Sequence, residues 1–178
     1  GCTAIASYIP WIVHEPQEGD VDVTGRRHPE HDIGAFMDLC HQHGLWFIPR
    51  PGPFVMAEMK NEGIPHWVYK RHPDAIPVTW EGKPGTTKTL NYLEPGYLDS
   101  ASRWYAAIMP LVAARLQSKG GPVIGVQLDN EFRGPAAYLL ALKQLAIDAG
   151  IDTPLYTRTG WPAPTSPMPF GDILPLFG

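Results

Sequence analysis

The order of apolar and amphipathic segments predicts an α/β fold built on a parallel sheet, either an open doubly wound sheet or part of a (β/α)8 barrel. Short runs rich in valine and isoleucine alternate with helix-like stretches along the chain. No Gly-x-Gly-x-x-Gly motif follows a predicted strand, which weakens a dinucleotide-binding fold. Polar residues follow at least three strand ends, which favours a barrel. A complete barrel takes about 250 residues, so we interpret residues 1–178 as one incomplete barrel domain.

The first half of the chain is predicted to contain two strands with a helix between them. Each strand is an apolar run closed by polar residues or prolines, and the helix is defined by apolar residues at helical spacing. The expected elements are a strand at Thr3–Trp11, a loop at 17–28, a helix from Ile33 that Gly44 caps, and a strand at Leu45–Pro49.

The second half begins with a long insertion, Phe54–Glu94, and a connection of this length is usually functional. It holds a predicted short helix and a turn-rich stretch, at His66–Arg71 and Glu81–Lys88. Further on, two helices and two strands alternate before a proline-rich tail that is expected to be irregular. These elements are Tyr97–Gln117, which Pro110 should kink or break, then Val123–Leu128, Pro135–Ala149, Pro154–Arg158 and the tail Pro162–Pro175.

The composition excludes several function classes. The net charge is −4 and the isoelectric point about 5.9, which gives no electrostatic reason to expect nucleic acid or an acidic membrane as a partner. No apolar run approaches the length of a membrane span. Two cysteines are too few for a disulfide framework, and Cys40, on the apolar stripe of its helix, is expected to be a buried free thiol.

The histidines do not form a recognisable metal motif, because none has the His-Glu-x-x-His spacing. We therefore expect solvated or capping histidines and no metal site; the residues concerned are His28, His31, His41 and His43. The sequence predicts neither an oligomeric state nor a cellular compartment. It begins Gly1-Cys2-Thr3 without methionine, from which we expect that the true N-terminus is missing.

The stretch Gly121–Phe132 carries the clearest functional signal. A short apolar run delivers Asn130 and Glu131 to its end. In barrel enzymes the chemistry lies where the strands finish, so Glu131 is the first candidate for a catalytic residue and Asn130 for a contact to the substrate. Taken alone, the pair would favour a helix start, because asparagine caps helices and glutamate is favoured in the first turn; the strand before it and the other motifs of the chain reverse this.

Two other strand ends supply polar groups that would meet this pair on one face of a barrel. The first strand ends near Tyr8 and His14-Glu15, and the second near Arg50 and Glu58. Carboxyl, amide and phenol groups among many aromatic rings are typical of a sugar site, because a carboxylic acid can protonate a glycosidic oxygen. Arg50 is expected to be a structural partner of strand-end carboxylates.

These segments resemble glycoside hydrolase family 35, the β-galactosidase family. The resemblance covers Ser7–Phe132 continuously and rests on three motifs in one order and spacing. The motifs are Tyr-Ile-Pro-Trp with His-Glu-Pro at Tyr8–Pro16, Arg-Pro-Gly-Pro-Phe-Val-Met-Ala-Glu at Arg50–Glu58, and Gly-Pro-Val-Ile-Gly-Val-Gln-Leu-Asp-Asn-Glu-Phe at Gly121–Phe132. Two positions depart from the family, with Ile12 where asparagine is common and Asp129 where glutamate is usual.

The resemblance implies a retaining glycosidase that cleaves terminal β-D-galactosides of an oligosaccharide or glycoconjugate, without metal or organic cofactor. It places the chain at roughly the second to fifth βα units of a TIM barrel. Glu131 matches the acid/base, and the nucleophile has no counterpart in the chain, so we expect the isolated chain to be inactive. The sugar contacts map onto Tyr8, Met56, Ala57, Glu58 and Asn130.

Two other functions stay open from the sequence. A protein could use the same barrel scaffold to bind carbohydrate without catalysis, or could be a metal-dependent barrel hydrolase. The glycosidase hypothesis makes one electrostatic prediction. A proton donor must hold its proton near neutral pH, so the pKa of Glu131 should be raised.

Overall fold

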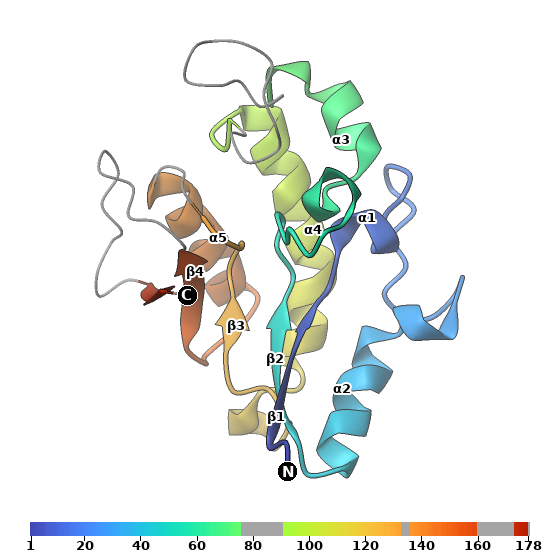
Figure 1. Cartoon of the computed structure of the whole chain (residues 1–178), viewed down its shortest axis with the longest axis vertical. Coiled ribbons are helices and arrows are strands. Elements are labelled where there is room, and N and C mark those ends of the chain that lie inside the picture. Colours follow the sequence, from blue (N-terminus) through green and yellow to red (C-terminus); the bar gives the residue numbers. More distant parts are fainter. Residues whose placement is uncertain (76–90, 133–135, 160–172, 178) are drawn as a thin grey trace.

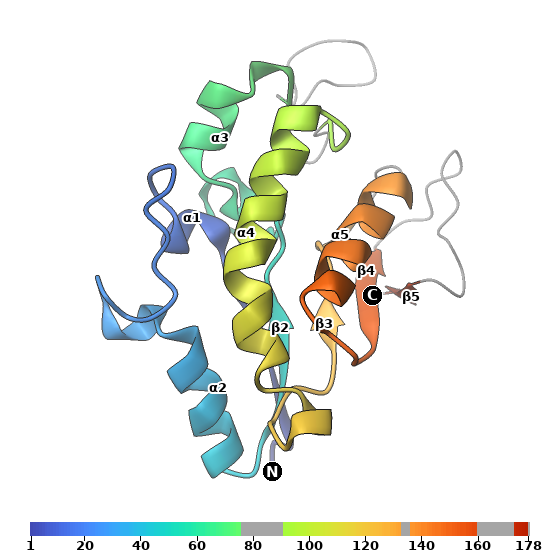
Figure 2. The same ribbon diagram turned by 180° about the vertical axis from the view of Figure 1, so that it is seen from behind.

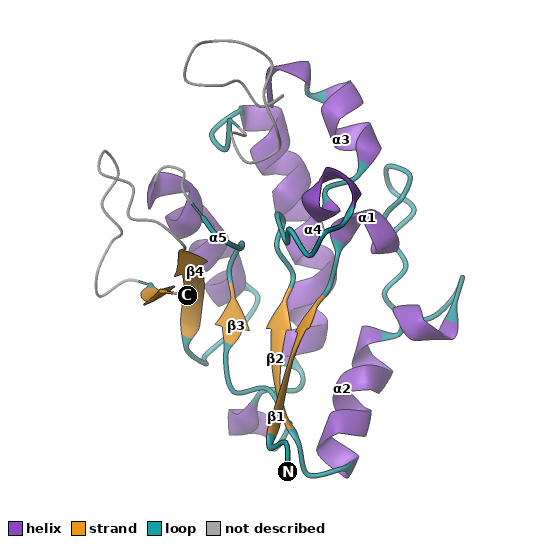
Figure 3. Cartoon of the chain, viewed as in Figure 1, coloured by secondary structure: helices purple, strands orange, loops and turns teal. Residues whose placement is uncertain are grey.

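The computed structural model describes residues 1–75, 91–132, 136–159 and 173–177, and it has a mixed α/β architecture (Figures 1 and 3). All paired strands run parallel. The strands are β1 (Ala4–Tyr8), β2 (Trp46–Arg50), β3 (Val126–Gln127), β4 (Leu155–Thr159) and β5 (Leu174–Phe177).

The strands lie in chain order across the molecule. β1 pairs with β2, and β3, β4 and β5 form a second hydrogen-bonded group. The segment just before β3 joins the two groups, because Phe47 donates its N–H to the carbonyl of Pro122 at 2.8 Å and accepts from Ile124 at 3.2 Å. The carboxyl ends of β1, β2, β3 and β4 therefore point to the same end of the molecule (Figure 1).

The helices connect successive strands, as the alternating sequence pattern predicts. α2 follows β1, α4 follows β2 and α5 follows β3. The last two lie behind the strands in Figure 1 and in front of them in Figure 2, so they cover the same face of the sheet. The helices are α1 (Trp11–His14), α2 (Ile33–Gln42), α3 (His66–Arg71), α4 (Pro95–Ala113) and α5 (Ala136–Asp148).

α4 positions the loop that follows β2. Glu94 caps its N-terminus by accepting hydrogen bonds from two backbone N–H groups. Its apolar face is fully buried, and two side chains on that face reach the β2 loop. The indole of Trp104 donates to the carbonyl of Pro51 at 2.8 Å, and the hydroxyl of Tyr105 donates to the carbonyl of Gly52 at 2.7 Å.

Several predicted elements are confirmed and several are wrong at their ends. α3 has the predicted bounds, and Cys40 is buried and free. The first strand stops at Tyr8 instead of Trp11, because Pro10 cannot donate to the ladder and α1 begins at Trp11. The third strand shrinks to Val126–Gln127. The stretch 81–88 lies outside the described residues.

Two expectations about proline are wrong in part. Pro110 does not break its helix, since α4 continues through it to Ala113. A proline in the last turn removes a single backbone hydrogen bond, and the buried face still holds the helix in place. Of the tail Pro162–Pro175 that was expected to be irregular, residues 162–172 lie outside the described residues, whereas Leu174–Phe177 forms β5 alongside β4. Proline is tolerated in a strand that lies at a sheet edge.

Within the residues that the structure describes, every helix is too short or too polar to cross a bilayer.

The turn that leads into β3 requires a glycine at position 121. Its N–H donates to the carbonyl of Leu116 at 2.9 Å, and a Cβ there would lie 2.1 Å from the carbonyl oxygen of Arg115. Gly121→Ala should therefore destabilise the protein by roughly 1–3 kcal/mol. Gly125→Ala is the matched control, because its Cβ would lie 3.5 Å from the nearest atom, in ordinary contact. Thermal unfolding that shows equal effects of the two changes would contradict this account of the turn.

Candidate active site

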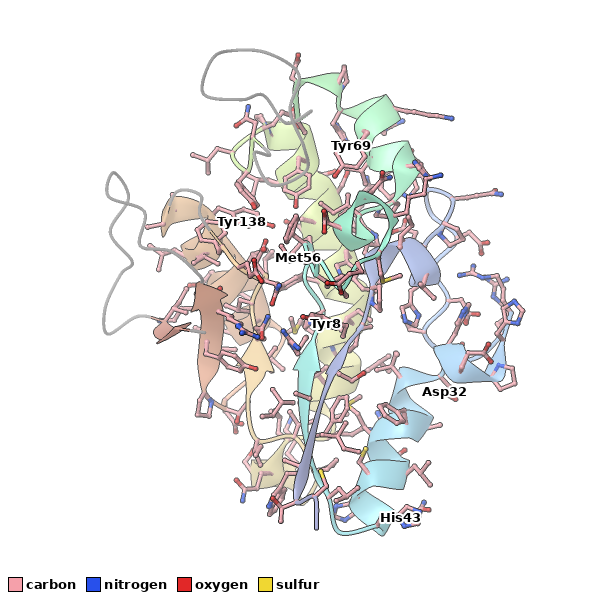
Figure 4. All side chains as sticks on the ribbon, viewed as in Figure 1. Tyr8, Asp32, His43, Met56, Tyr69 and Tyr138 are labelled. Atoms are coloured by element: carbon pink, nitrogen blue, oxygen red, sulfur yellow. The ribbon has the colours of Figure 1, made fainter. Side chains whose placement is uncertain are left out.

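Three strand ends meet at one place in the molecule. Tyr8 ends β1 and lies opposite Arg50, which ends β2. Gln127 ends β3, and Asn130 and Glu131 follow within the next few residues. In parallel strands the carboxyl ends share an edge, so side chains from distant parts of the chain come together there. Figure 4 places Tyr8 in the middle of this edge.

The guanidinium of Arg50 links the three strand ends. Its Nε donates to Oε1 of Gln127 at 2.9 Å, and its Nη2 donates to the hydroxyl oxygen of Tyr8 at 2.7 Å and to Oδ1 of Asn130 at 2.9 Å. The guanidinium carbon lies 3.8 Å from the centre of the Tyr8 ring, which adds a cation–π contact. Carboxylates were expected as the partners of Arg50; this was wrong, because its hydrogen-bond partners here are neutral phenol and amide groups.

The backbone after β3 is strained where the candidate residues lie. Asp129 has φ 57° and Glu131 has φ 45°, both in the left-handed region that costs ordinary residues about 1–2 kcal/mol each. The N–H of Asp129 donates to the carbonyl of Gly52 at 2.9 Å, and Gln127 Nε2 donates to the carbonyl of Asp129 at 2.8 Å. These bonds hold the strained turn, which leaves Asn130 buried and Glu131 half-buried. Strain of this kind is concentrated at functional sites.

Asn130 and Glu131 do not belong to the helix that follows them. The described part of α5 begins at Ala136, and the N–H of Phe132 donates to the carbonyl of Arg158 at 3.1 Å, beside β4. The pair lies in the loop after β3, so the helix-start interpretation does not apply to it.

The loop after β2 is strained as well. Met56, Ala57 and Glu58 have φ 59°, 52° and 52°. The carbonyl of Glu62 accepts from Val55 at 2.9 Å and from Met56 at 3.2 Å, which closes this loop on itself. Met56 is half-buried against the core, and Figure 4 places it beyond Tyr8 on the side of the strand ends.

The hydrogen bonds bring together some of the expected site residues. Tyr8 and Asn130 share Arg50 as a donor. Glu58 is exposed, and no hydrogen bond between described residues joins its side chain to Tyr8 or Asn130.

The residues His14 and Glu15 support the loop after β1. His14 lies against the backbone carbonyl of Asp22, with Nδ1 at 2.7 Å. Glu15 accepts from the indole of Trp11 at 2.6 Å and from the N–H of Gly19 at 2.8 Å. Among the described residues, no group of three or more His, Cys, Asp or Glu side chains has a geometry that could hold a metal ion.

Asp129 is a buried acid beside the site that sequence reasoning noted only as a departure from glutamate. It is 1% exposed. Its Oδ1 accepts the N–H of Asn130 at 2.7 Å, whereas Oδ2 has no hydrogen-bond partner among the described residues. Burial raises the pKa of Asp129 to about 7. The tyrosines of α4 and α5 surround it: Tyr97, Tyr105 and Tyr138.

The sequence signals that could have identified Gln127 and Asp129 are weak. Both lie in the motif Gly121–Phe132. The apolar run in this motif predicts a strand, but it does not indicate what any single side chain does. A glutamine inside an otherwise apolar strand is the one cue for Gln127, because a buried amide needs partners.

Comparisons with known proteins identify the family of the chain. The sequence profile of glycosyl hydrolases family 35 matches residues 1–168. An exo-β-D-glucosaminidase of Pyrococcus horikoshii is 39% identical over 134 residues, which are 74% of this chain and 17% of that protein. A β-galactosidase of Homo sapiens is 32% identical over 165 residues, 90% of this chain and 22% of that protein. A β-galactosidase of Felis catus is 34% identical over 132 residues, which are 74% of this chain and 17% of that protein. The chain therefore spans about a fifth of the length of these relatives.

The buried carboxyl of Asp129 predicts a pH dependence of stability. Between about pH 4, the ordinary pKa of aspartate, and about pH 7, the folded state keeps a proton that the unfolded state releases. The contribution of Asp129 to the free energy of unfolding should therefore fall as pH rises through this window and level off above it. Asp129→Asn removes this dependence, because an amide does not titrate.

Thermal unfolding of the parent protein and the variant should test this. The two melting temperatures should be similar at about pH 4, at the lower end of this window, and the variant should melt higher at about pH 8. Groups that titrate in both proteins cancel in the comparison. A variant that is less stable by the same amount at both pH values would show that Asp129 is charged throughout.

Proposed function

The chain belongs to glycosyl hydrolases family 35, and from this premise we propose that it is part of the catalytic barrel of a retaining glycosidase that cleaves terminal β-D-galactosides. The observation that carries the proposal is the meeting of three strand ends through Arg50, with Glu131 beside them. Relatives from Homo sapiens and Felis catus that are named β-galactosidase support the substrate class.

We propose that the described sheet is one part of a barrel wall. The family is a TIM-barrel family. Parallel strands in chain order, with α4 and α5 on one face, are the arrangement of a barrel, whereas a doubly wound sheet has helices on both faces. The described residues supply five strands, one more than the four expected from the sequence. The barrel would be completed by sequence outside residues 1–178.

In this proposal Glu131 is the acid/base. Its proton passes to the glycosidic oxygen as the bond from that oxygen to the anomeric carbon breaks, while a carboxylate from another barrel strand attacks the anomeric carbon. In the second step Glu131 takes a proton from water, which then displaces the enzyme carboxylate. The two carboxyl groups of retaining enzymes lie about 5–5.5 Å apart. Glu131 is half-buried and so remains accessible to a substrate.

The proposed sugar contacts come from the same three strand ends. Tyr8 and Asn130 face the site through their shared bonds to Arg50. Glu58 would bind sugar hydroxyls, and Met56 and Ala57 would contribute backbone groups from their strained loop. The reaction needs no metal or organic cofactor in this scheme, because proton transfer and nucleophilic attack are both performed by carboxyl groups.

A second substrate is favoured by one comparison. The relative from Pyrococcus horikoshii, at 39% identity, is named exo-β-D-glucosaminidase. A terminal amino sugar is therefore the alternative substrate for the same site and the same chemistry.

Glu131→Gln in the full-length protein should abolish cleavage of galactosides with poor leaving groups, with a loss of roughly 10²–10⁴-fold. Activated aryl galactosides should lose much less, because their leaving groups need little protonation. The measurement is kcat/KM for an alkyl and a nitrophenyl galactoside. Asp152→Asn, a change at an exposed carboxylate just before the amino end of β4, should leave both rates unchanged.

Equal losses on the two substrates, or none, would exclude Glu131 as the proton donor. No turnover of any β-glycoside by the unmodified protein, together with tight sugar binding, would favour a carbohydrate-binding protein that lacks catalysis.

The 178-residue chain on its own should show no turnover, because the proposed nucleophile lies outside it. Incubation of the purified chain with a nitrophenyl galactoside measures this directly. Release of nitrophenol above the level of a blank without protein would place a nucleophile within the chain.

A further inference from the structure

The strand β4 brings two more side chains to the site. In the register of β3 against β4, Gln127 lies opposite Tyr156. Paired residues of parallel strands point to the same face of the sheet, and on this face Gln127 accepts a hydrogen bond from Arg50. Thr157, which points to the opposite face, is fully buried. Tyr156 therefore lies on the same face of the sheet as the guanidinium of Arg50.

Arg158 lies on this face as well, closer to the carboxyl end of β4. It follows Tyr156 by two residues, so its side chain points to the same side about 6.6 Å further along the strand. Burial raises the pKa of Tyr156, while the nearby positive charges of Arg50 and Arg158 act to lower it. Tyr156 is half-buried, whereas Arg158 is exposed. Arg158 is thus at the rim of the site.

The backbone places Arg158 beside the turn that carries the proposed proton donor. The carbonyl of Arg158 accepts a hydrogen bond from the N–H of Phe132 at 3.1 Å. Phe132 directly follows Glu131, so residues 131 and 158 belong to neighbouring segments of the chain. Asn130, one residue before Glu131, is buried, whereas Glu131 is half-buried. The turn therefore runs from the interior of the site toward the exposed rim.

The described part of the chain does not neutralise the positive charge of Arg158. No hydrogen bond or ion pair between described residues uses its side chain, and this includes the carboxylates of Glu58 and Glu131. The other described arginines, apart from Arg50 with its neutral partners, each pair with an aspartate or a glutamate; they are Arg26, Arg27, Arg71, Arg103 and Arg115. A guanidinium group beside the site without a carboxylate partner is suited to an anion on the substrate.

The two sugars on either side of the glycosidic oxygen occupy different parts of the site in the proposed function. Tyr8 and Asn130 are the proposed contacts of the terminal sugar, and both are tied to Arg50. Glu131 gives its proton to the oxygen that joins this sugar to the leaving group. The leaving group lies on the far side of that oxygen, toward the exposed rim where Arg158 lies.

We propose that Arg158 binds an acidic group on the leaving group, so that the enzyme prefers terminal β-galactosides attached to a sugar that carries a carboxylate or a sulfate. This inference rests on the proposed function, which puts the glycosidic oxygen beside Glu131. A guanidinium group can offer two parallel N–H donors to either anion, and such charge-assisted hydrogen bonds are about twice as strong as neutral ones. An ammonium group on the leaving group would be repelled by the same charge.

The experiment compares three disaccharides on the full-length protein. They are lactose, the analogue in which glucuronic acid replaces the glucose of lactose, and lactose that is sulfated on its glucose. The terminal galactose is the same in all three. A hydrogen bond to a charged group can change kcat/KM by about tenfold, although solvent weakens the contribution of an exposed charge. The unmodified enzyme should therefore prefer an acidic disaccharide over lactose by roughly fivefold to tenfold.

Arg158→Gln removes the charge at an exposed position, so it should abolish this preference and leave kcat/KM for lactose nearly unchanged. Arg158→Lys keeps the charge but not the planar group of donors, and should retain part of the preference. Lys119→Gln is the matched control. It removes one positive charge from an exposed residue that lies before the amino end of β3, and should leave all three rates unchanged.

Two outcomes would overturn the inference although a galactosidase remains. One is equal cleavage of lactose and both acidic disaccharides by the unmodified enzyme. The other is an equal loss on all three substrates in Arg158→Gln, which would show that Arg158 has only a structural role. A preference for one of the two anions supports the inference and identifies the acidic group.

Calorimetric binding separates this inference from the proposed function. The Glu131→Gln protein should bind the preferred acidic disaccharide more tightly than lactose, and the added change Arg158→Gln should remove the difference. The same binding difference in an unmodified protein that shows no turnover would support the inference and contradict the proposed catalysis. Binding of no disaccharide, together with no turnover, would overturn both.

Discussion

The guanidinium of Arg50 is the interaction on which the site depends. Three of its N–H donors join the end of β2 to groups at the ends of β1 and β3, and the most distant of these groups, Asn130, lies 80 positions away in the sequence. The guanidinium group is planar and carries several N–H donors, so one rigid side chain can orient several acceptors at once. The register of β1 against β2 places Tyr8 opposite Arg50, so the network follows directly from the strand pairing.

The site is held by a scaffold that tolerates local strain. Left-handed residues occur in the loops after β2 and after β3. The two loops are tied to each other and to α4, because the carbonyl of Gly52 accepts both the N–H of Asp129 and the hydroxyl of Tyr105. The buried aromatic face of α4 thus fixes the backbone that presents Asn130 and Glu131. Such packing can maintain conformations that would each cost about 1–2 kcal/mol in isolation.

Local pattern predicted the order of strands and helices and the meeting of polar side chains at the carboxyl ends of the strands. The strand-to-carboxylate motif and the polar strand ends required only periodicity and the rule that barrel sites lie at carboxyl ends. Strand boundaries were less predictable. Pro10 ended β1 early, and β5 formed despite Pro175, because the pairing of neighbouring strands decides such positions.

The hydrogen-bond partners of the site could not be predicted from the sequence. Arg50 was expected to pair with carboxylates, and its true partners depend on the register of β1, β2 and β3. The buried acid of the site region is Asp129, whose pKa is raised by tertiary burial that no local pattern reports. The orientation of the Asn130 amide likewise depends on two residues that are distant or inconspicuous in the sequence.

The most direct test of the account is a crystal structure of the full-length Glu131→Gln protein with an intact nitrophenyl β-D-galactoside bound. The account predicts that the glycosidic oxygen lies beside residue 131 and that the side chains of Tyr8 and Asn130 lie within hydrogen-bond distance of the sugar, about 2.7–3.2 Å. A sugar bound away from the ends of β1, β2 and β3 would contradict it.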